Sequence, residues 1–134
     1  MMKFLLSSKS VALDLALFIL RVGSAGMMMT HGWNKLMNFQ EKSVSWPDPL
    51  HVGHSVSLGM TVFAELFCAG FLLLGLFSRL ALVPLIFLMA VAVFVIHAGD
   101  SFGDKEHAVL FLVPYIVLFF TGPGIYSLDS IRKK

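Results

Sequence analysis

Charged and titratable side chains occur inside otherwise apolar stretches of this sequence, where each of them is costly to bury. Arg21 and Glu65 each lie near the middle of a long apolar run, and His31 and Lys35 follow Arg21 at spacings that keep them on one face of a helix. His97 closes a third apolar run. Basic groups donate hydrogen bonds to carbonyl oxygens, and a carboxylate exchanges protons. This combination favours a site for a ligand that has polar oxygens and takes up or loses protons.

The elements that carry these residues are long apolar segments. Of the 134 residues, 57% are hydrophobic and 13% are charged, and the mean hydropathy is +0.85, far above that of soluble proteins. About 20 apolar residues span the hydrocarbon core of a bilayer as a helix. The sequence therefore predicts an all-α protein, a four-helix transmembrane bundle that uses residues 1–134 as one membrane domain. The predicted spans are residues 11–36, 55–77, 80–98 and 106–121.

The basic residues in the flanks predict the orientation, because Lys and Arg in short flanks resist translocation. One side of the predicted bundle holds Lys3, Lys9, Arg79, Arg132, Lys133 and Lys134. The other side holds Lys35, Lys42 and Lys105. Both termini are therefore expected in the cytoplasm, and the protein is expected in a bacterial inner membrane. The net charge of +2 arises from these flanks and gives no indication of a nucleic-acid partner.

Counting residues from the predicted span ends places two opposite charges at similar depth. Arg21 and Glu65 each lie about 15 Å from the start of their span, at 1.5 Å per residue. Antiparallel neighbours would then bring them together, so the sequence predicts an ion pair between Arg21 and Glu65 near the bilayer midplane. Whether this pair only fixes helix packing or lines a ligand pocket stays open at this point.

The histidines all fall on the outer side of the predicted topology: His31, His51, His54, His97 and His107. Imidazole ligates metals and haem readily. However, the H-x-x-H of His51 and His54 has no second ligand pair, and nothing besides His31 and His97 marks a haem pocket. We therefore expect neither metal nor haem.

Other cofactor chemistry is also limited. Cys68 is the only cysteine, so the chain alone cannot exchange disulfides with a quinone. No glycine-rich nucleotide motif occurs either. A cofactor would have to come from the membrane or from a partner, and quinone is the one candidate that the sequence favours.

Four sequence runs, in this order and spacing, resemble the DoxX family. They are HGWNKL at 31–36, WPDPL at 46–50, ELFCAGFLLLGLFSR at 65–79 and GPGIYSLD at 122–129. The resemblance implies a four-helix integral membrane protein, in a family named after a small subunit of a thiosulfate:quinone oxidoreductase. It implies recurrent polar positions here at Arg21, His31, Gly32, Lys35, Glu65 and Arg79, and packing or turn glycines at 70, 75, 122 and 124. The sequence departs at His51, where related chains often have glycine.

Two functions remain in view. The first is a membrane subunit of a quinone-linked oxidoreductase that has no redox centre of its own and binds quinone or quinol between the first two helices, at Arg21, His31, Lys35, Glu65 and His97. The alternative is a non-catalytic lipid-binding, partner-anchoring or solute-transport component with a structural ion pair. The expected partners are membrane lipids, at which Trp33 and Trp46 would anchor, and a redox subunit, with a homo-oligomer left open.

Overall fold

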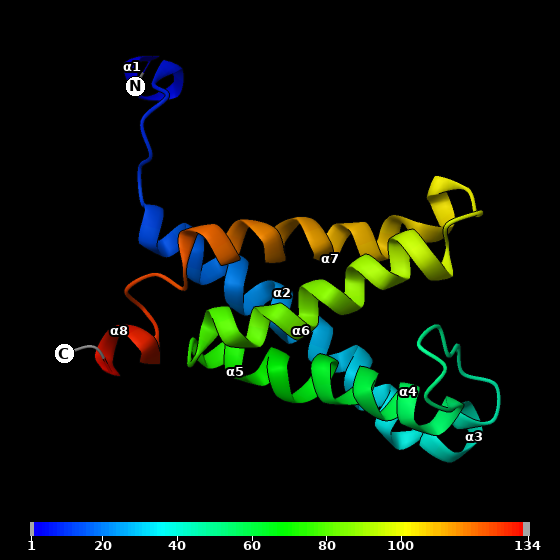
Figure 1. Ribbon diagram of the computed structural model, residues 1–134. Coiled ribbons are helices and arrows are strands. Elements are labelled where there is room, and N and C mark those ends of the chain that lie inside the picture. The colour runs from blue at the N-terminus through cyan, green and yellow to red at the C-terminus, as the bar shows by residue number, and fades with distance from the viewer. Residues whose placement is uncertain (1, 133–134) are drawn as a thin grey trace.

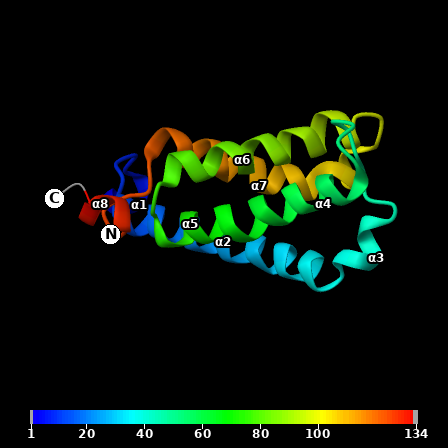
Figure 2. The same ribbon diagram turned by 60° about the horizontal axis from the view of Figure 1, so that its bottom comes forward.

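The structure is a computed structural model that describes residues 2–132, and no strand occurs among them. Figures 1 and 2 show long helices running side by side, with short helices at the ends. The elements are α1 (Met2–Leu6), α2 (Leu13–Met37), α3 (Phe39–Ser43), α4 (His54–Val62), η1 (Phe63–Cys68), α5 (Ala69–Leu74), α6 (Ser78–Val91), η2 (Ala92–Ile96), α7 (Phe102–Thr121) and α8 (Leu128–Arg132). Lys133 and Lys134, which the sequence assigns to the cytoplasmic flank, lie outside the described residues.

Two of the long segments contain a wider π-helical turn. The segment α4, η1 and α5 continues without a break from His54 to Leu74, and η1 is its π-helical part. Likewise, α6 continues into η2, which is π-helical. α2 packs against η1 and α5, while α6 packs against α7 and η1. The core between them is made of side chains such as Leu58, Leu72, Leu82, Leu85 and Tyr115, which are fully buried.

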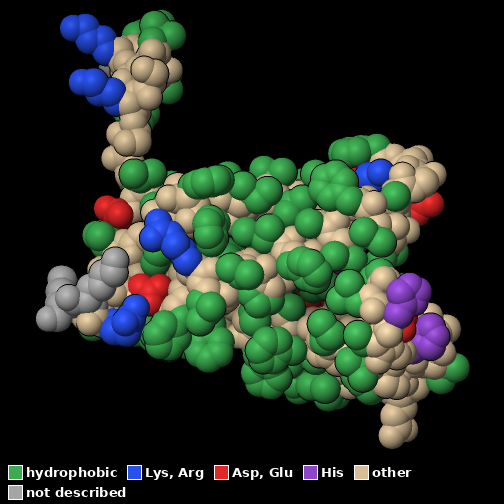
Figure 3. Space-filling model, viewed as in Figure 1, with side chains coloured by type: hydrophobic (Ala, Val, Ile, Leu, Met, Phe, Trp, Pro, Cys, Tyr) green, Lys and Arg blue, Asp and Glu red, His purple; other side chains and the backbone are tan. Residues whose placement is uncertain are grey.

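Three of these helical segments are long and apolar enough to cross a membrane: Leu13–Met37, His54–Leu74 and Ser78–Ile96. They correspond to the predicted spans 11–36, 55–77 and 80–98, with ends that differ by a few residues. α7 also forms where the sequence predicts a helix, and it begins a few residues earlier, so that Lys105 and Glu106 lie within its length. Hydrophobic side chains cover the long helices on the face seen in Figure 3. Such a surface is compatible with lipid and not with water.

On the face seen in Figure 3, the exposed charged side chains lie mainly toward the two ends of the bundle. We call the end near α1, α8 and the α5–α6 turn the termini end. The opposite end, which carries α3, the segment 44–53 and the start of α7, we call the histidine end. His31 and His107 are in contact there. His97 lies beside Trp46 on the wall of one cavity, which is described below. His54 is hydrogen-bonded to the backbone carbonyl of Trp46. The predicted grouping of the histidines on one side is confirmed.

Candidate functional site

The carboxylate of Glu65 is paired with Lys35 and not with Arg21. Lys35 Nζ lies 2.6 Å from Oε1 and 2.7 Å from Oε2 of Glu65. Glu65 is buried, with 3% of its surface exposed. The ring of Trp46 lies 5.5 Å from the same Nζ, in cation–π contact. The predicted ion pair between Arg21 and Glu65 is therefore wrong, although the expectation that Glu65 needs a basic partner is correct.

The relative position of α2 and η1 explains this pairing. A Cβ atom on Gly32 would lie 2.9 Å from the backbone carbon of Glu65 and 2.9 Å from the backbone nitrogen of Leu66, so the two helices touch at this glycine. Gly32 is thus level with Glu65, whereas Arg21 lies eleven residues earlier, about 16 Å along the axis. Side chains on a helix lean toward its N-terminus, so Lys35 reaches back from the next turn to Glu65.

Arg21 instead binds backbone carbonyls at the termini end. The residue is 2% exposed, and its guanidinium donates to the carbonyl oxygens of Leu73 (3.3 and 3.4 Å), Pro123 (2.7 Å) and Tyr126 (2.8 Å). Leu73 lies in the last turn of α5, where carbonyls lack helical partners and carry the negative end of the helix dipole. Arg21 therefore joins α2, α5 and the segment before α8.

Two further charged side chains at the termini end form hydrogen bonds with unpaired backbone groups at helix ends. Arg79 donates to the carbonyls of Phe119 (2.9 Å) and Phe120 (3.4 Å) in the last turn of α7. Asp129 accepts from the backbone N–H groups of Phe77 (2.7 Å) and Ser78 (2.9 Å), where α6 begins. Partial burial alone would raise the pKa of the Asp129 carboxyl, but these N–H donors hold that pKa below its usual value.

The histidine end holds a cluster of aromatic and imidazole rings. Nε2 of His31 and Nε2 of His107 are 3.1 Å apart, so one nitrogen donates a hydrogen and the other accepts it. Both rings lie edge-on to Phe111, with centroids 5.9 and 5.2 Å away. Nδ1 of His97 is 2.9 Å from Oδ2 of Asp100.

A cavity of about 280 Å³ lies beside the Lys35–Glu65 pair. The polar or aromatic groups on its wall are Lys35, Trp46, Thr61, Glu65, His97 and His107, and the rest of the wall is mainly apolar. Glu65 belongs to η1, and the cavity wall also includes Ala92 and Ile96 of η2. π-helical turns inside α-helices occur frequently at functional sites. The predicted residues Lys35, Glu65 and His97 thus border one cavity, His31 contacts its wall through His107, and Arg21 is remote from it.

The sequence did not assign three residues of this region to the site. Trp46 and His107 line the cavity, and Tyr115 lies near Glu65 without lining it. Trp46 covers Lys35, and His107 pairs with His31. Tyr115 of α7 lies within electrostatic range of Glu65, and its buried hydroxyl has no hydrogen-bond partner among the described residues. An unpaired buried hydroxyl is costly, so it is a candidate to bind water or a ligand oxygen. The clustering of histidines at one side was the only sequence signal that pointed to His107.

The segment 44–53 is held over this end of the bundle by its own hydrogen bonds. Asp48 accepts from the backbone N–H groups of Val52 (2.9 Å) and Gly53 (2.8 Å). The bond from Val52, supported by that from Gly53, holds the pKa of the Asp48 carboxyl below its usual value. Ser57 of α4 donates to the carbonyl of Pro47 at 2.7 Å. These bonds fix Trp46 and Pro47 against the cavity.

Comparison with protein families matches residues 16–98 to DoxX, which is more than half of the chain. The chain belongs to the DoxX family. The match extends from α2 to just beyond η2, and so includes Arg21, Lys35 and Glu65 in the family domain. In this DoxX protein, α7 with His107 and Tyr115 follows the matched range. No curated protein and no solved structure matches the chain. Family membership and the apolar helices together identify an integral membrane protein.

Proposed function

We propose that this DoxX protein is a membrane subunit of a quinone-linked oxidoreductase and binds quinone or quinol at the histidine end. The observation that carries the proposal is the Lys35–Glu65 pair on the wall of a largely apolar cavity. A quinone needs an apolar slot for its ring and polar donors at its carbonyl oxygens, and it exchanges protons when electrons are transferred. The cavity offers each of these features, and the DoxX family supplies the link to oxidoreductases.

The residues present fit a quinone ring in chemical terms. Lys35, on the cavity wall, carries hydrogens that a carbonyl oxygen can accept. The Tyr115 hydroxyl, which has no partner among the described residues, is a further donor near Glu65, although Tyr115 does not line the cavity. The bound quinone would supply the two-electron, two-proton chemistry. Lys35 would turn from Glu65 to a ligand oxygen, which frees Glu65 to exchange a proton. The His31–His107 contact would pass that proton toward the outer surface.

The proposal includes a placement in the membrane. We propose four membrane spans, α7 being the fourth, with both termini in the cytoplasm of a bacterium and the cavity toward the outer face of the inner membrane. Lys3, Lys9, Arg79 and Arg132 lie in the segments of the termini end, which supports this orientation. A redox partner would dock on the outer side, with lipids around the helices; a homo-oligomer is compatible with this arrangement.

The orientation is tested by labelling with a membrane-impermeant maleimide. In a Cys68→Ala background, His51→Cys should be labelled from outside intact cells, whereas Ser130→Cys should react only after the membrane is opened. The reverse labelling pattern would contradict the proposed orientation, but it would not bear on quinone binding in the cavity.

Quinone binding is tested by the ultraviolet–visible spectrum and the lipid extract of protein purified in mild detergent. We expect bound quinone in the unmodified protein and its loss in Glu65→Gln and in His31→Ala. Glu41→Gln and His51→Ala are matched controls, because Glu41 and His51 are exposed and do not line the cavity. No quinone in the unmodified protein, with partner binding intact in Glu65→Gln and His31→Ala, would favour a purely structural ion pair and a non-catalytic role.

A further inference from the structure

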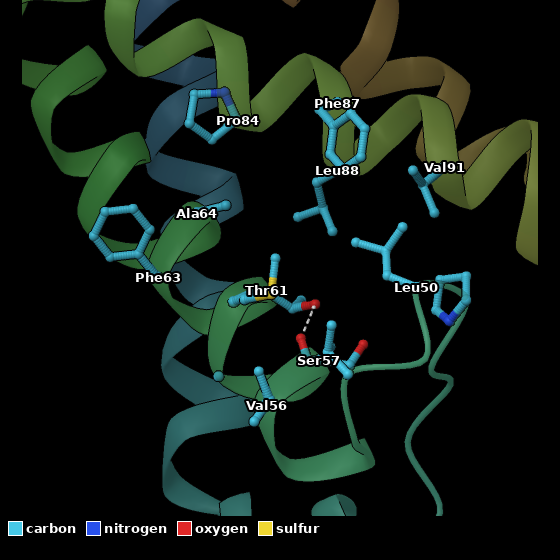
Figure 4. A pocket seen from close by; sticks show the side chains of 14 residues that line it. Leu50, Val56, Ser57, Thr61, Phe63, Ala64, Pro84, Phe87, Leu88 and Val91 are labelled. Atoms are coloured by element: carbon cyan, nitrogen blue, oxygen red, sulfur yellow. Dashed lines mark hydrogen bonds between the residues drawn. The ribbon is translucent and has the colours of Figure 1, made fainter.

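A second cavity of about 600 Å³ lies next to the first, between α4, η1 and α6 (Figure 4). Its wall is almost wholly apolar and includes Phe63, Phe87 and Val91. Ser57 and Thr61 also line it, but the hydroxyl of Ser57 donates to the carbonyl of Pro47, and that of Thr61 donates to the carbonyl of Ser57 at 3.0 Å. With these hydroxyl hydrogens already bonded, the cavity is suited to a hydrocarbon. We call it the apolar groove.

The apolar groove and the polar cavity adjoin each other. Thr61 and Leu88 line both of them, Thr61 from α4 and Leu88 from α6. Further along the same helical segment, Ala64 lines the apolar groove, and its neighbour Glu65 lines the polar cavity. A ligand that passes between Thr61 and Leu88 would therefore meet a polar wall on one side and an apolar wall on the other.

One segment of chain covers both spaces. Trp46 and Pro47 line the polar cavity, and Pro49, Leu50 and Val52 line the apolar groove. Figure 4 shows Leu50 directed toward Leu88 and Val91 of α6 across the groove. The bonds of Asp48 to Val52 and Gly53 hold the segment in this form. A single cover over adjoining polar and apolar spaces indicates one amphiphilic occupant rather than two separate ligands.

We propose that the apolar groove holds the isoprenoid tail of the same quinone whose ring occupies the polar cavity; this rests on the function proposed above. The tail leaves the ring between Thr61 and Leu88 and runs along α4 and α6 beneath residues 49–52. The methyl branches of an isoprenoid chain suit a wall of proline, leucine, valine and phenylalanine side chains, which is irregular and rigid. The protein is therefore selective for tailed quinones, and not only for the ring.

Gly59 offers a way to fill the groove without disturbing the helices. It lines the groove, and a Cβ atom there would meet nothing within 4 Å. In Gly59→Phe the ring should occupy the space of the tail. Gly23→Phe is the matched control, because a Cβ at Gly23 also meets nothing within 4 Å and that residue, in α2, does not line the groove.

The experiment measures dissociation constants for two probes, 2,3-dimethoxy-5-methyl-1,4-benzoquinone and its decyl-tailed analogue, in nanodiscs. Gly59→Phe should weaken binding of the decyl analogue by about tenfold or more and that of the tail-less ring by less than about twofold. Gly23→Phe should change neither constant. Equal effects of Gly59→Phe on both probes, or no effect on either, would overturn the tail site and leave quinone binding standing. Failure of the unmodified protein to bind either probe would overturn the proposed function itself.

A second measurement uses the unmodified protein and so does not depend on the folding of a variant. An analogue with a photoreactive group on its tail should attach to residues 56–63 or 84–91, and excess tail-less quinone should suppress the attachment. Adducts confined to the shallow surface between Met29 and Gly70, on the other side of η1, would contradict the assignment.

Discussion

The two ends of the bundle use buried charge in different ways. At the termini end, Arg21, Arg79 and Asp129 bind backbone groups at the ends of helices. At the histidine end, Lys35 binds Glu65 and His31 binds His107, side chain to side chain, beside a cavity. In the part of the chain that the structure describes, each end has one buried charged residue, Arg21 at the termini end and Glu65 at the histidine end, and the two are buried against different kinds of partner.

The choice of partner determines what each end can do. A backbone carbonyl cannot leave a helix end, so a guanidinium bound to it has one stable arrangement and locks the elements together. A lysine and a glutamate can separate when another donor or acceptor enters, and the space beside them allows it. We therefore assign stabilisation of the fold to the termini end and, under the proposed function, exchange of partners for a ligand to the histidine end. The predictions that follow test this division.

The largest effect is expected from removing the charge at the termini end. Arg21→Leu leaves the carbonyls of Leu73, Pro123 and Tyr126 buried without a donor, and should cost at least about 3 kcal/mol of stability. Thermal unfolding in detergent would measure the loss. Arg79→Leu, at an exposed arginine of the same end, should cost less. Equal losses in the two variants would show that burial of Arg21 is not what matters.

A smaller effect is expected where α2 touches η1. In Gly32→Ala the added methyl group would meet backbone atoms of Glu65 and Leu66 at 2.9 Å, so the helices must separate, at about 1 to 3 kcal/mol. Lys35 should then lose its reach to Glu65, and quinone binding should weaken with stability. Gly26→Ala, where a Cβ meets nothing within 4 Å, is the control and should be neutral or slightly stabilising. An unchanged ligand affinity in Gly32→Ala would show that ligand binding does not depend on the close approach of α2 and η1.

Acid should loosen the termini end through Asp129. Its lowered pKa means that the folded protein holds the proton less readily than the unfolded chain, so this stabilisation is complete above the ordinary pKa of 3.8. It should disappear as the pH falls through that value toward the lower folded pKa. Hydrogen exchange at the amides of Phe77 and Ser78 between about pH 5 and pH 2.5 would measure it. Asp129→Asn should remove this pH dependence; its persistence would assign the effect to another group.

The smallest effect is expected in the segment that covers the histidine end. His51 has φ +58°, a left-handed conformation that costs residues other than glycine about 1 kcal/mol. His51→Gly should leave stability unchanged or raise it by a few tenths of a kcal/mol, since the added freedom of the unfolded chain offsets part of the relief. Gly53→Ala, with φ +105°, should be destabilising by comparison. Thermal unfolding of both variants would check this.

The sequence predicted the long helices and the grouping of the histidines at one end, because hydropathy and the position of a residue within a span can be read from each segment alone. It did not predict the position of α2 relative to η1. Counting depth from the expected span ends assumed that the two antiparallel helices extend between the same two membrane planes. The contact at Gly32 instead places Glu65 next to Lys35 and leaves Arg21 near the termini end. His107 and Tyr115 were missed because α7 joins the site only after packing.

The measurement that tests the division most directly is the shift in unfolding temperature caused by decyl-tailed quinone in variants of the two ends. A ligand at about 100 times its dissociation constant stabilises the protein by about 2.7 kcal/mol. Arg79→Gln should unfold at a lower temperature than the unmodified protein and still show the full shift, whereas Lys35→Met should show none. A full shift in Lys35→Met, or its loss in Arg79→Gln, would contradict the assignment of ligand binding to the histidine end.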